Sequence, residues 1–180
     1  MEENEAKQPA ENDSSQPTVR SVGLKFGLIS AILSIVFFLV LTLSGQNAFD
    51  NKWSWISITF SVVILIFGQK NFKDEGDGFM SYGQGVGIGF WISLTAVVIG
   101  GLFTYVYSNI IDPATMEAFY DKQYEQMEMN GMGDEQIEMA IGWTKKLFWP
   151  MYVFFGILFG VLIALIVTIF TQKKAPEQRF

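Results

Sequence analysis

The segment FWPMYVFFGILFGVLIALIVTIF (Phe148–Phe170) decides the fold class, because it is long, strongly apolar and free of charged residues. A membrane-spanning helix needs about 20 apolar residues, since each residue advances it by about 1.5 Å through a hydrocarbon core of roughly 30 Å. Two further segments meet this requirement, Val22–Leu43 and Val86–Tyr107, and Lys25 is the one charged residue in them. Three such segments in a chain of 180 residues predict an integral membrane protein.

A fourth apolar segment, WSWISITFSVVILIFG (Trp53–Gly68), is shorter and reaches only about 24 Å as a helix. Trp53 and Trp55 can sit in one membrane interface while the side chain of Lys70 extends into the other. We therefore predict a fourth span here. A re-entrant or interfacial segment is the alternative that its length leaves open.

These segments together predict an all-α fold, an integral membrane four-helix bundle. The spans are expected at about residues 22–43, 53–68, 84–107 and 148–170, within a membrane domain of residues 20–172. Residues 112–147 are expected to form an extramembrane helical hairpin between the third and fourth spans. Residues 1–19 are polar and rich in Glu, Gln, Ser and Pro, which predicts a disordered cytoplasmic tail, and residues 173–180 form a second short tail.

The hairpin is expected from capping and break signals. Asp112 can cap a first helix that begins at Pro113, Gly131 and Gly133 can end it, and Asp134 can cap a second helix. The first helix has an apolar stripe (Met116, Phe119, Tyr120, Tyr124, Met127) beside an acidic one (Glu117, Asp121, Glu125, Glu128). We expect the hairpin to cover the outer mouth of the bundle with its apolar stripe facing inward.

The positive charges predict the orientation. With four spans, both termini lie on one side, which then carries eight basic residues (Lys7, Arg20, Lys25, Lys70, Lys73, Lys173, Lys174, Arg179) against four on the other (Lys52, Lys122, Lys145, Lys146). Cytoplasmic loops carry the excess of Lys and Arg, so the N- and C-termini are predicted to be cytoplasmic. Trp53, Trp55, Tyr105, Tyr107, Trp149 and Tyr152 would then form an aromatic belt on the opposite face.

The glycines of YGQGVGIGF (Tyr82–Phe90) are interpreted as a helix-packing feature. They lack the third glycine of a dinucleotide-binding loop and the lysine of a P-loop. Small residues instead recur at helical spacing in three spans: Gly23, Gly27, Ala31 and Ser34; Gly85, Gly89, Ser93, Ala96 and Gly100; Gly156, Gly160, Ala164 and Thr168. Such stripes let helices approach closely in lipid. Local unwinding of the glycine-rich helix to line a substrate path is the alternative.

The composition limits the kinds of functional site that the chain can form. The chain has no Cys and no His, and its formal net charge of −6 offers no basic surface for nucleic acid. The turn after the second span lacks the ligand spacing of an EF-hand, and the acidic residues of the hairpin have no recognisable nucleophile beside them. The sequence therefore predicts no catalytic residue, no metal site and no cofactor. Lys25 is expected to anchor the first span by extending toward the interface, with a lipid headgroup or a cytoplasmic loop as the other possible contacts.

Several stretches resemble a bacterial four-helix membrane protein family, domain of unknown function 4199. They are LKFGLISAILSIVFF in the first span, FKDEGDGFMSYGQGVGIG and YVYSNIIDPATMEAF around the third, NGMGDEQIEMA in the hairpin, and Trp149-Pro150. The resemblance covers residues 20–172 and implies a multi-pass protein of the bacterial inner membrane. It implies no catalytic residue and no ligand.

Three functions remain open at the level of sequence. The favoured one is a non-enzymatic scaffold or interaction protein that contacts the lipid bilayer and binds a protein partner through the hairpin, or another copy of itself. The alternative is a small channel or transporter, which Ser, Thr and backbone groups near the glycines would line. A membrane enzyme is the least favoured, because it would depend on the hairpin carboxylates with Lys145 or Lys146.

Overall fold

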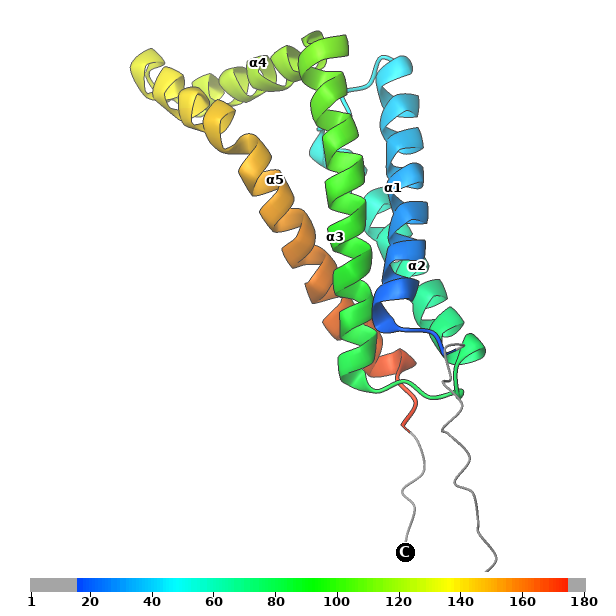
Figure 1. Ribbon diagram of the computed structural model, residues 1–180. Helices are drawn as coiled ribbons and strands as arrows, with labels where there is room; N and C mark the ends of the chain where they lie inside the picture. The colour runs from blue at the N-terminus through cyan, green and yellow to red at the C-terminus, as the bar shows by residue number, and fades with distance from the viewer. Residues whose placement is uncertain (1–15, 175–180) are drawn as a thin grey trace, which may run out of the picture.

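The computed structural model describes residues 16–174, which form five α-helices and no β-strand (Figure 1). The helices are α1 (Val19–Leu43), α2 (Ser54–Glu75), α3 (Tyr82–Val106), α4 (Ala114–Met129) and α5 (Asp134–Thr171). A short 3-10 turn (Asn51–Trp53) leads into α2, and a π-helical segment (Tyr107–Ile111) extends α3. The predicted all-α fold class is confirmed. The predicted tails lie outside the described residues, except for residues 16–19 and 173–174.

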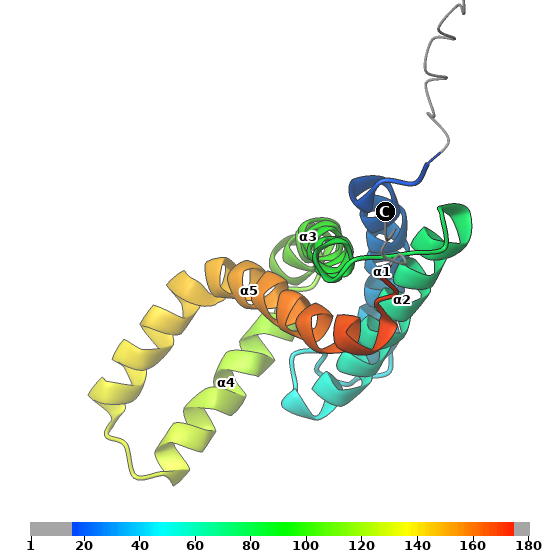
Figure 2. The same ribbon diagram turned by 90° about the horizontal axis from the view of Figure 1, so that it is seen from below.

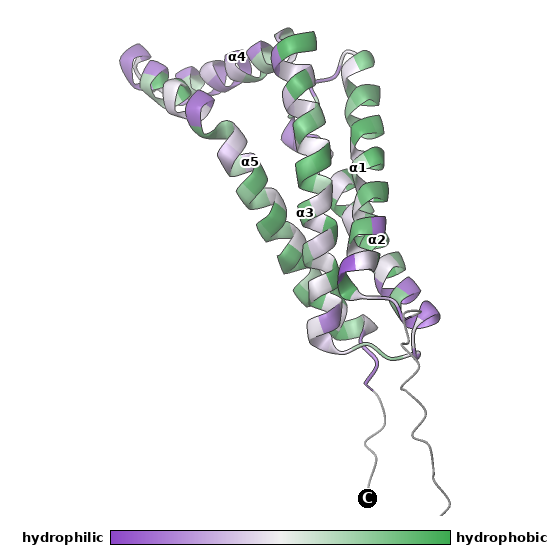
Figure 3. Ribbon diagram, viewed as in Figure 1, coloured by the Kyte–Doolittle hydropathy of each residue, from purple (hydrophilic) through white to green (hydrophobic). Residues whose placement is uncertain are grey.

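Four of these helices are long and apolar enough to span a membrane, as the sequence predicted. They comprise Val19–Leu43, Asn51–Glu75, Tyr82–Ile111 and Asp134–Thr171. Figure 3 shows hydrophobic residues along the long helices, whereas α4, the start of α5 and the loops near the termini are more hydrophilic. This distribution is that of a membrane protein with polar ends.

Helix α2 is longer than the predicted span. It continues past Gly68 to Glu75, and its 22 residues reach about 33 Å, enough to cross the hydrocarbon core. The extension is polar in sequence, but Gln69 and Phe72 within it are buried against neighbouring helices. The short apolar segment is therefore the first part of one helix that is long enough to cross the hydrocarbon core, which favours a span over a re-entrant segment.

In helix α5 the predicted second hairpin helix and the predicted fourth span, residues 148–170, join without a break. It is a single helix of 38 residues with Pro150 inside it. Proline removes one backbone hydrogen bond and bends a helix, and the helix continues where the residues on both sides favour it. Figure 2 shows α5 changing direction between its first part and the long part that packs in the bundle.

Helix α3 occupies the centre, with α1 packed along one side and α5 along the other, while α2 lies against α1 and α5 (Figures 1 and 2). We call the end of the bundle that leads to both chain termini the terminal end, and the opposite end the hairpin end. The main hydrophobic core lies toward the terminal end and consists of Val22, Ile64, Leu65, Phe72, Met80, Ile88, Ile92 and Ala164. This cluster therefore joins all four long helices at one end of the bundle.

Helix α4 and the first part of α5 form a hairpin around a turn in which Gly131 has φ +80°. The hairpin extends sideways from the bundle, not across its mouth as the sequence predicted (Figures 1 and 2). The apolar stripe of α4 instead faces the α1–α2 loop and α5, where Phe119 packs against Phe49 and Phe148. These aromatic partners are distant in sequence, so helical periodicity alone could not reveal them.

The hairpin helices also begin differently from the prediction. Helix α4 starts at Ala114, and the Asp112 carboxylate accepts a hydrogen bond from the Thr115 hydroxyl at 2.8 Å in place of a backbone N–H. Helix α5 starts at Asp134 itself, with Gly133 in the capping position. The acidic Asp134 therefore lies in the first turn, where the positive end of the helix dipole stabilises its negative charge.

Candidate functional site

Close backbone approach joins α3 to α5 at the terminal end. A Cβ atom added at Gly85 would overlap the Thr168 side chain, and one added at Gly89 would overlap that of Ala164. Similarly, a Cβ atom at Gly160 would overlap the side chain of Ser93. These contacts place four predicted packing residues, Gly85, Gly89, Ser93 and Gly160, in a single interface.

The other predicted packing glycines lie farther along the α3–α5 interface or between α1 and α3. Gly23 and Gly27 of α1 face α3, where a Cβ atom at Gly27 would lie 2.6 Å from Cβ of Thr95. Gly156 of α5 faces Val97, at 2.8 Å from its nearest side-chain atom. Gly100 differs from the rest, because a Cβ atom there would meet its nearest neighbour, Ser34, only at 3.9 Å. Among these glycines Gly100 is therefore the one with room for a side-chain atom.

A fully buried glutamine, Gln69, joins three helices at the terminal end. Its Nε2 donates hydrogen bonds to the carbonyl oxygen of Gly85 in α3 (3.0 Å) and to Oγ1 of Thr168 in α5 (2.8 Å). Its Oε1 accepts a hydrogen bond from the hydroxyl of Thr171. Both polar ends of the amide are therefore satisfied in a buried site. The sequence alone did not predict this residue, although its uncharged polar side chain directly follows an apolar segment.

Backbone contacts reinforce the terminal end. Met80 and Lys173 form an isolated antiparallel bridge, with N–H to O distances of 2.8 and 3.0 Å. The Lys73 ammonium donates to the carbonyl oxygen of Thr171 at 2.8 Å, which satisfies an acceptor at the end of α5. We call Gln69, Thr168, Thr171 and the Met80–Lys173 bridge the terminal clasp.

Lys25 contacts the end of α2. Its ammonium lies 3.3 Å from a carboxylate oxygen of Glu75 and 3.5 Å from the amide oxygen of Asn71. The side chains of Lys25 and Glu75 are both about half exposed. The structure thus pairs Lys25 with the polar last turns of α2, which belong to the helix and not to the loop after it.

The hairpin is tied to the bundle by polar contacts with the α1–α2 loop. The Lys122 ammonium lies 2.6 Å from the Asp50 carboxylate, and Nδ2 of Asn47 donates to the carbonyl oxygen of Thr115 at 3.2 Å. Between the hairpin helices, the Tyr124 hydroxyl donates to Asp134 at 3.4 Å. Desolvation, and then the nearby Asp134 carboxylate, raise the pKa of Tyr124, so its hydroxyl keeps the proton that it donates.

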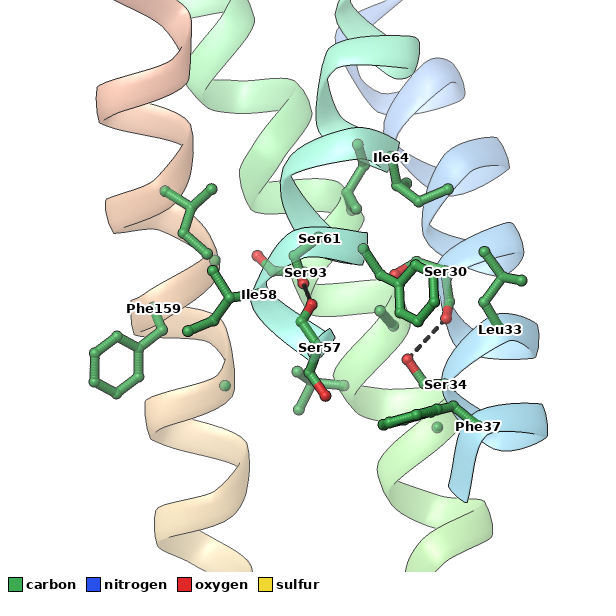
Figure 4. Close-up of a pocket in the computed structure, with 18 of the residues that line it drawn as sticks. Ser30, Leu33, Ser34, Phe37, Ser57, Ile58, Ser61, Ile64, Ser93 and Phe159 are labelled. Carbon is green, nitrogen blue, oxygen red and sulfur yellow. Dashed lines mark hydrogen bonds between the residues drawn. The ribbon is translucent and has the colours of Figure 1, made fainter. Parts of the chain in front are cut away.

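A cavity of about 490 Å³ lies between α1, α2, α3 and α5. Serines from three helices line it: Ser57 and Ser61 of α2, Ser93 of α3, and Ser30 and Ser34 of α1 (Figure 4). Aromatic and aliphatic side chains supply most of the remaining wall, including Phe37, Phe38, Phe60, Phe155, Phe159, Leu33, Leu41, Leu65, Ile58, Ile64, Ile92 and Ile163. No charged side chain lines it.

The serine hydroxyls of the cavity donate mainly to their own helices. Ser34 donates to the Ser30 carbonyl at 2.9 Å, Ser61 to the Ser57 carbonyl at 2.9 Å, and Ser93 to the Gly89 carbonyl at 2.9 Å. Each bonded hydroxyl retains acceptor lone pairs. The cavity can therefore accept hydrogen bonds from a molecule inside it. Among residues 16–174, no group of three or more Asp, Glu, His or Cys side chains is placed to hold a metal ion.

An all-helical chain with four helices of this length and apolarity has the features of a multi-pass membrane protein. A family model described as Protein of unknown function (DUF4199) matches residues 25–173. The chain belongs to this family, and the resemblance seen in its motifs is confirmed. No curated protein and no solved structure matches the chain significantly.

Proposed function

We propose that this chain is a non-enzymatic interaction protein of the bacterial inner membrane that binds a protein partner through its hairpin. The observation that carries the proposal is the sideways projection of the hairpin, which places α4 and the start of α5 beyond the bundle (Figure 2). Within the apolar stripe of α4, Met116 is buried and Phe119 packs against Phe49 and Phe148, so the exposed hairpin surface is what remains to bind a partner.

The exposed hairpin surface combines acidic and apolar side chains. Met129, Met139 and Trp143 are more than half exposed although they are large and apolar. Exposed carboxylates accompany them on α4 (Glu117, Asp121, Glu125, Glu128). Tryptophan is the residue most enriched at binding hot spots, and a row of carboxylates favours a partner with Lys or Arg. The proposed partner is therefore a protein with an apolar patch beside a basic one.

The proposed orientation places both termini in the cytoplasm and the hairpin on the outer face. Its support is the distribution of positive charge. In the described part of the chain the terminal end carries Arg20, Lys25, Lys70, Lys73, Lys173 and Lys174, whereas the hairpin end carries Lys52, Lys122, Lys145 and Lys146. A reporter that is active only in the cytoplasm, fused after Phe180, tests this orientation. An inactive reporter with a stable fusion protein would reverse it.

Photocrosslinking tests the partner. We expect a photoreactive amino acid at position 143 to capture another protein in intact cells. The same residue at position 55 is the matched control, because Trp55 is also exposed, at 77%, but does not belong to the hairpin. Capture of a second copy of the chain would identify self-association as the interaction. If neither position captured a protein, the interaction proposal would lose its support.

The second candidate is a small channel or carrier, and the cavity between the four long helices favours it. Its walls provide hydroxyl groups within an otherwise apolar bundle. A polar solute would need such groups as hydrogen-bond partners. Purified protein in liposomes tests this candidate through the flux of ions and small solutes. Absence of flux above that of protein-free liposomes would remove it.

A further inference from the structure

We propose that the cavity between α1, α2, α3 and α5 binds an uncharged lipid whose head carries a free hydroxyl group, such as a diacylglycerol or a long-chain alcohol. The inference rests on the proposed membrane location of the four helices, but not on the partner of the hairpin. The cavity volume of about 490 Å³ lies within the usual range of small-molecule sites, roughly 300–1,000 Å³.

The hydrogen-bonding state of the serines selects a ligand that donates. Ser34, Ser61 and Ser93 use their protons on carbonyl groups of their own helices, so they face the cavity as acceptors. In an apolar site an unpaired donor of the ligand would be costly, and these oxygens can satisfy it. A ligand hydroxyl fits this arrangement, because it can donate to one of these oxygens and accept from another cavity hydroxyl, such as that of Ser30.

The absence of charge among the lining residues excludes the head of a phospholipid. A phosphate placed here would lose its hydration without gaining a Lys or Arg partner. Depth leads to the same conclusion, because Ser93 lies about 17 Å along α3 from Tyr82, near the middle of a helix of 25 residues. Phospholipid heads stay in the interface, but an uncharged head can enter the hydrocarbon region.

The apolar walls and the divergence of α2 from α5 provide a place for the acyl chains. Ile58 of α2 and Phe159 of α5 both line the cavity, and Figure 4 shows the Phe159 ring projecting from the outer side of α5. Both side chains are substantially exposed, at 44% and 58%. A lipid can therefore reach the serines laterally from the bilayer, with its chains remaining between the two helices.

The test uses the full-length protein in phospholipid nanodiscs that contain a photoreactive diacylglycerol. Photoreactive phosphatidylcholine with the same acyl chains is the comparison lipid. We expect the diacylglycerol to label peptides of α2 and α3 around Ser57, Ser61 and Ser93 more strongly than phosphatidylcholine does. In S57A/S61A, which removes two hydroxyls without filling space, selective labelling should fall about tenfold, as expected for one or two lost hydrogen bonds.

Two further variants distinguish the effect of cavity-lining residues from that of another residue on the same helix. S57L/S61L fills the cavity and should abolish the selective labelling. T59L is the matched control, because Thr59 lies on the same helix and donates to the Trp55 carbonyl at 2.9 Å but does not line the cavity. T59L should retain the labelling of the unmodified protein. All variants are compared as monodisperse protein on size exclusion.

The other outcomes would overturn the inference. Equal labelling by both lipids would mean that acyl chains fill the gap without selection for the head. Crosslinks between two copies across the gap would mean that a second chain occupies it. Labelling of exposed α5 residues such as Phe154 without cavity labelling would reject the site while supporting the membrane location. No labelling by phosphatidylcholine anywhere would reject the membrane location itself.

Discussion

The two halves of α2 show how differently the ends of this bundle are packed. Toward the terminal end, Ile64, Leu65, Gly68, Gln69 and Phe72 are buried, whereas all residues from Ser54 to Phe60 are exposed. Helix α5 has the same contrast. Ala164 and Thr168 are buried, and the residues from Pro150 to Phe155 are exposed.

The difference follows from side-chain size and from the weak drive for association in lipid. At the terminal end Gly85 and Gly89 face Thr168 and Ala164, so the backbones meet and the terminal clasp can form. At the hairpin end large side chains, such as Phe60 and Phe159, line the gap. In water such a gap would tend to close, but lipid chains contact apolar surfaces as well as another helix does, so helices can remain apart.

The largest expected effect comes from breaking the terminal end with G89L. Its Cβ would overlap Ala164, and the longer side chain would force α3 away from α5, at a cost of about 3 kcal/mol or more. Unfolding in mixed detergent micelles, followed by circular dichroism, measures the change. G83L is the control, because nothing lies within 4 Å of a Cβ atom at Gly83. Equal destabilisation by both variants would contradict the proposed difference between faces of α3.

A smaller loss is expected from Q69L, which removes the centre of the terminal clasp. The variant loses hydrogen bonds to Gly85, Thr168 and Thr171, and we expect destabilisation by about 2 kcal/mol. The same unfolding measurement applies. K70L provides the control at the next, exposed position. A Q69L protein as stable as K70L would show that the clasp contributes nothing beyond packing.

A substitution at Gly100, toward the hairpin end, should not lower the free energy of unfolding. In G100A the new methyl group would lie at an ordinary contact distance, 3.9 Å from Ser34, while the unfolded chain loses freedom. We therefore expect no loss, or a gain of about 0.5–1 kcal/mol. Comparison with G89A under identical conditions sharpens the contrast between the ends. A loss in G100A as large as that in G89A would place both glycines in equally tight interfaces.

The smallest effect is expected for the ion pair between Lys25 and Glu75. Both side chains are about half exposed, and exposed ion pairs gain little because water and salt screen them. K25Q, E75Q and the double variant should have the same free energy of unfolding within experimental error. A clear coupling in this double-mutant cycle would show that the pair holds α1 to α2 and that the terminal clasp is not sufficient.

Much of the fold was predictable because the decisive patterns are local. Uninterrupted apolar length predicted four spans, and helical spacing predicted small-residue stripes in α1, α3 and α5. The length of α2 was underestimated because its last turns are polar, and their burial depends on Thr168 and Thr171, which are distant in sequence. The sequence did not predict the continuity of α5 through Pro150, because a proline within an apolar segment can either end a helix or bend it.

The candidate site was less predictable than the fold. Ser30, Ser57 and Ser93 belong to three helices, and their sequence positions give no indication that they share a cavity. The sequence predicted hydroxyl groups along a path in general terms, but only the divergence of α2 from α5 defines the space between them. Gln69 was missed for a related reason, since its partners come from two other helices.

The sequence by itself determined that the chain is helical, that four helices are long and apolar enough for a bilayer, and where small residues recur along them. These properties depend on residue type and spacing within one helix. Only the tertiary structure decided which glycines are tightly packed, where Gln69 finds its partners, and which way the hairpin projects. Such features depend on contacts between helices, because in lipid the fit of facing side chains, and not the apolar pattern, selects neighbours.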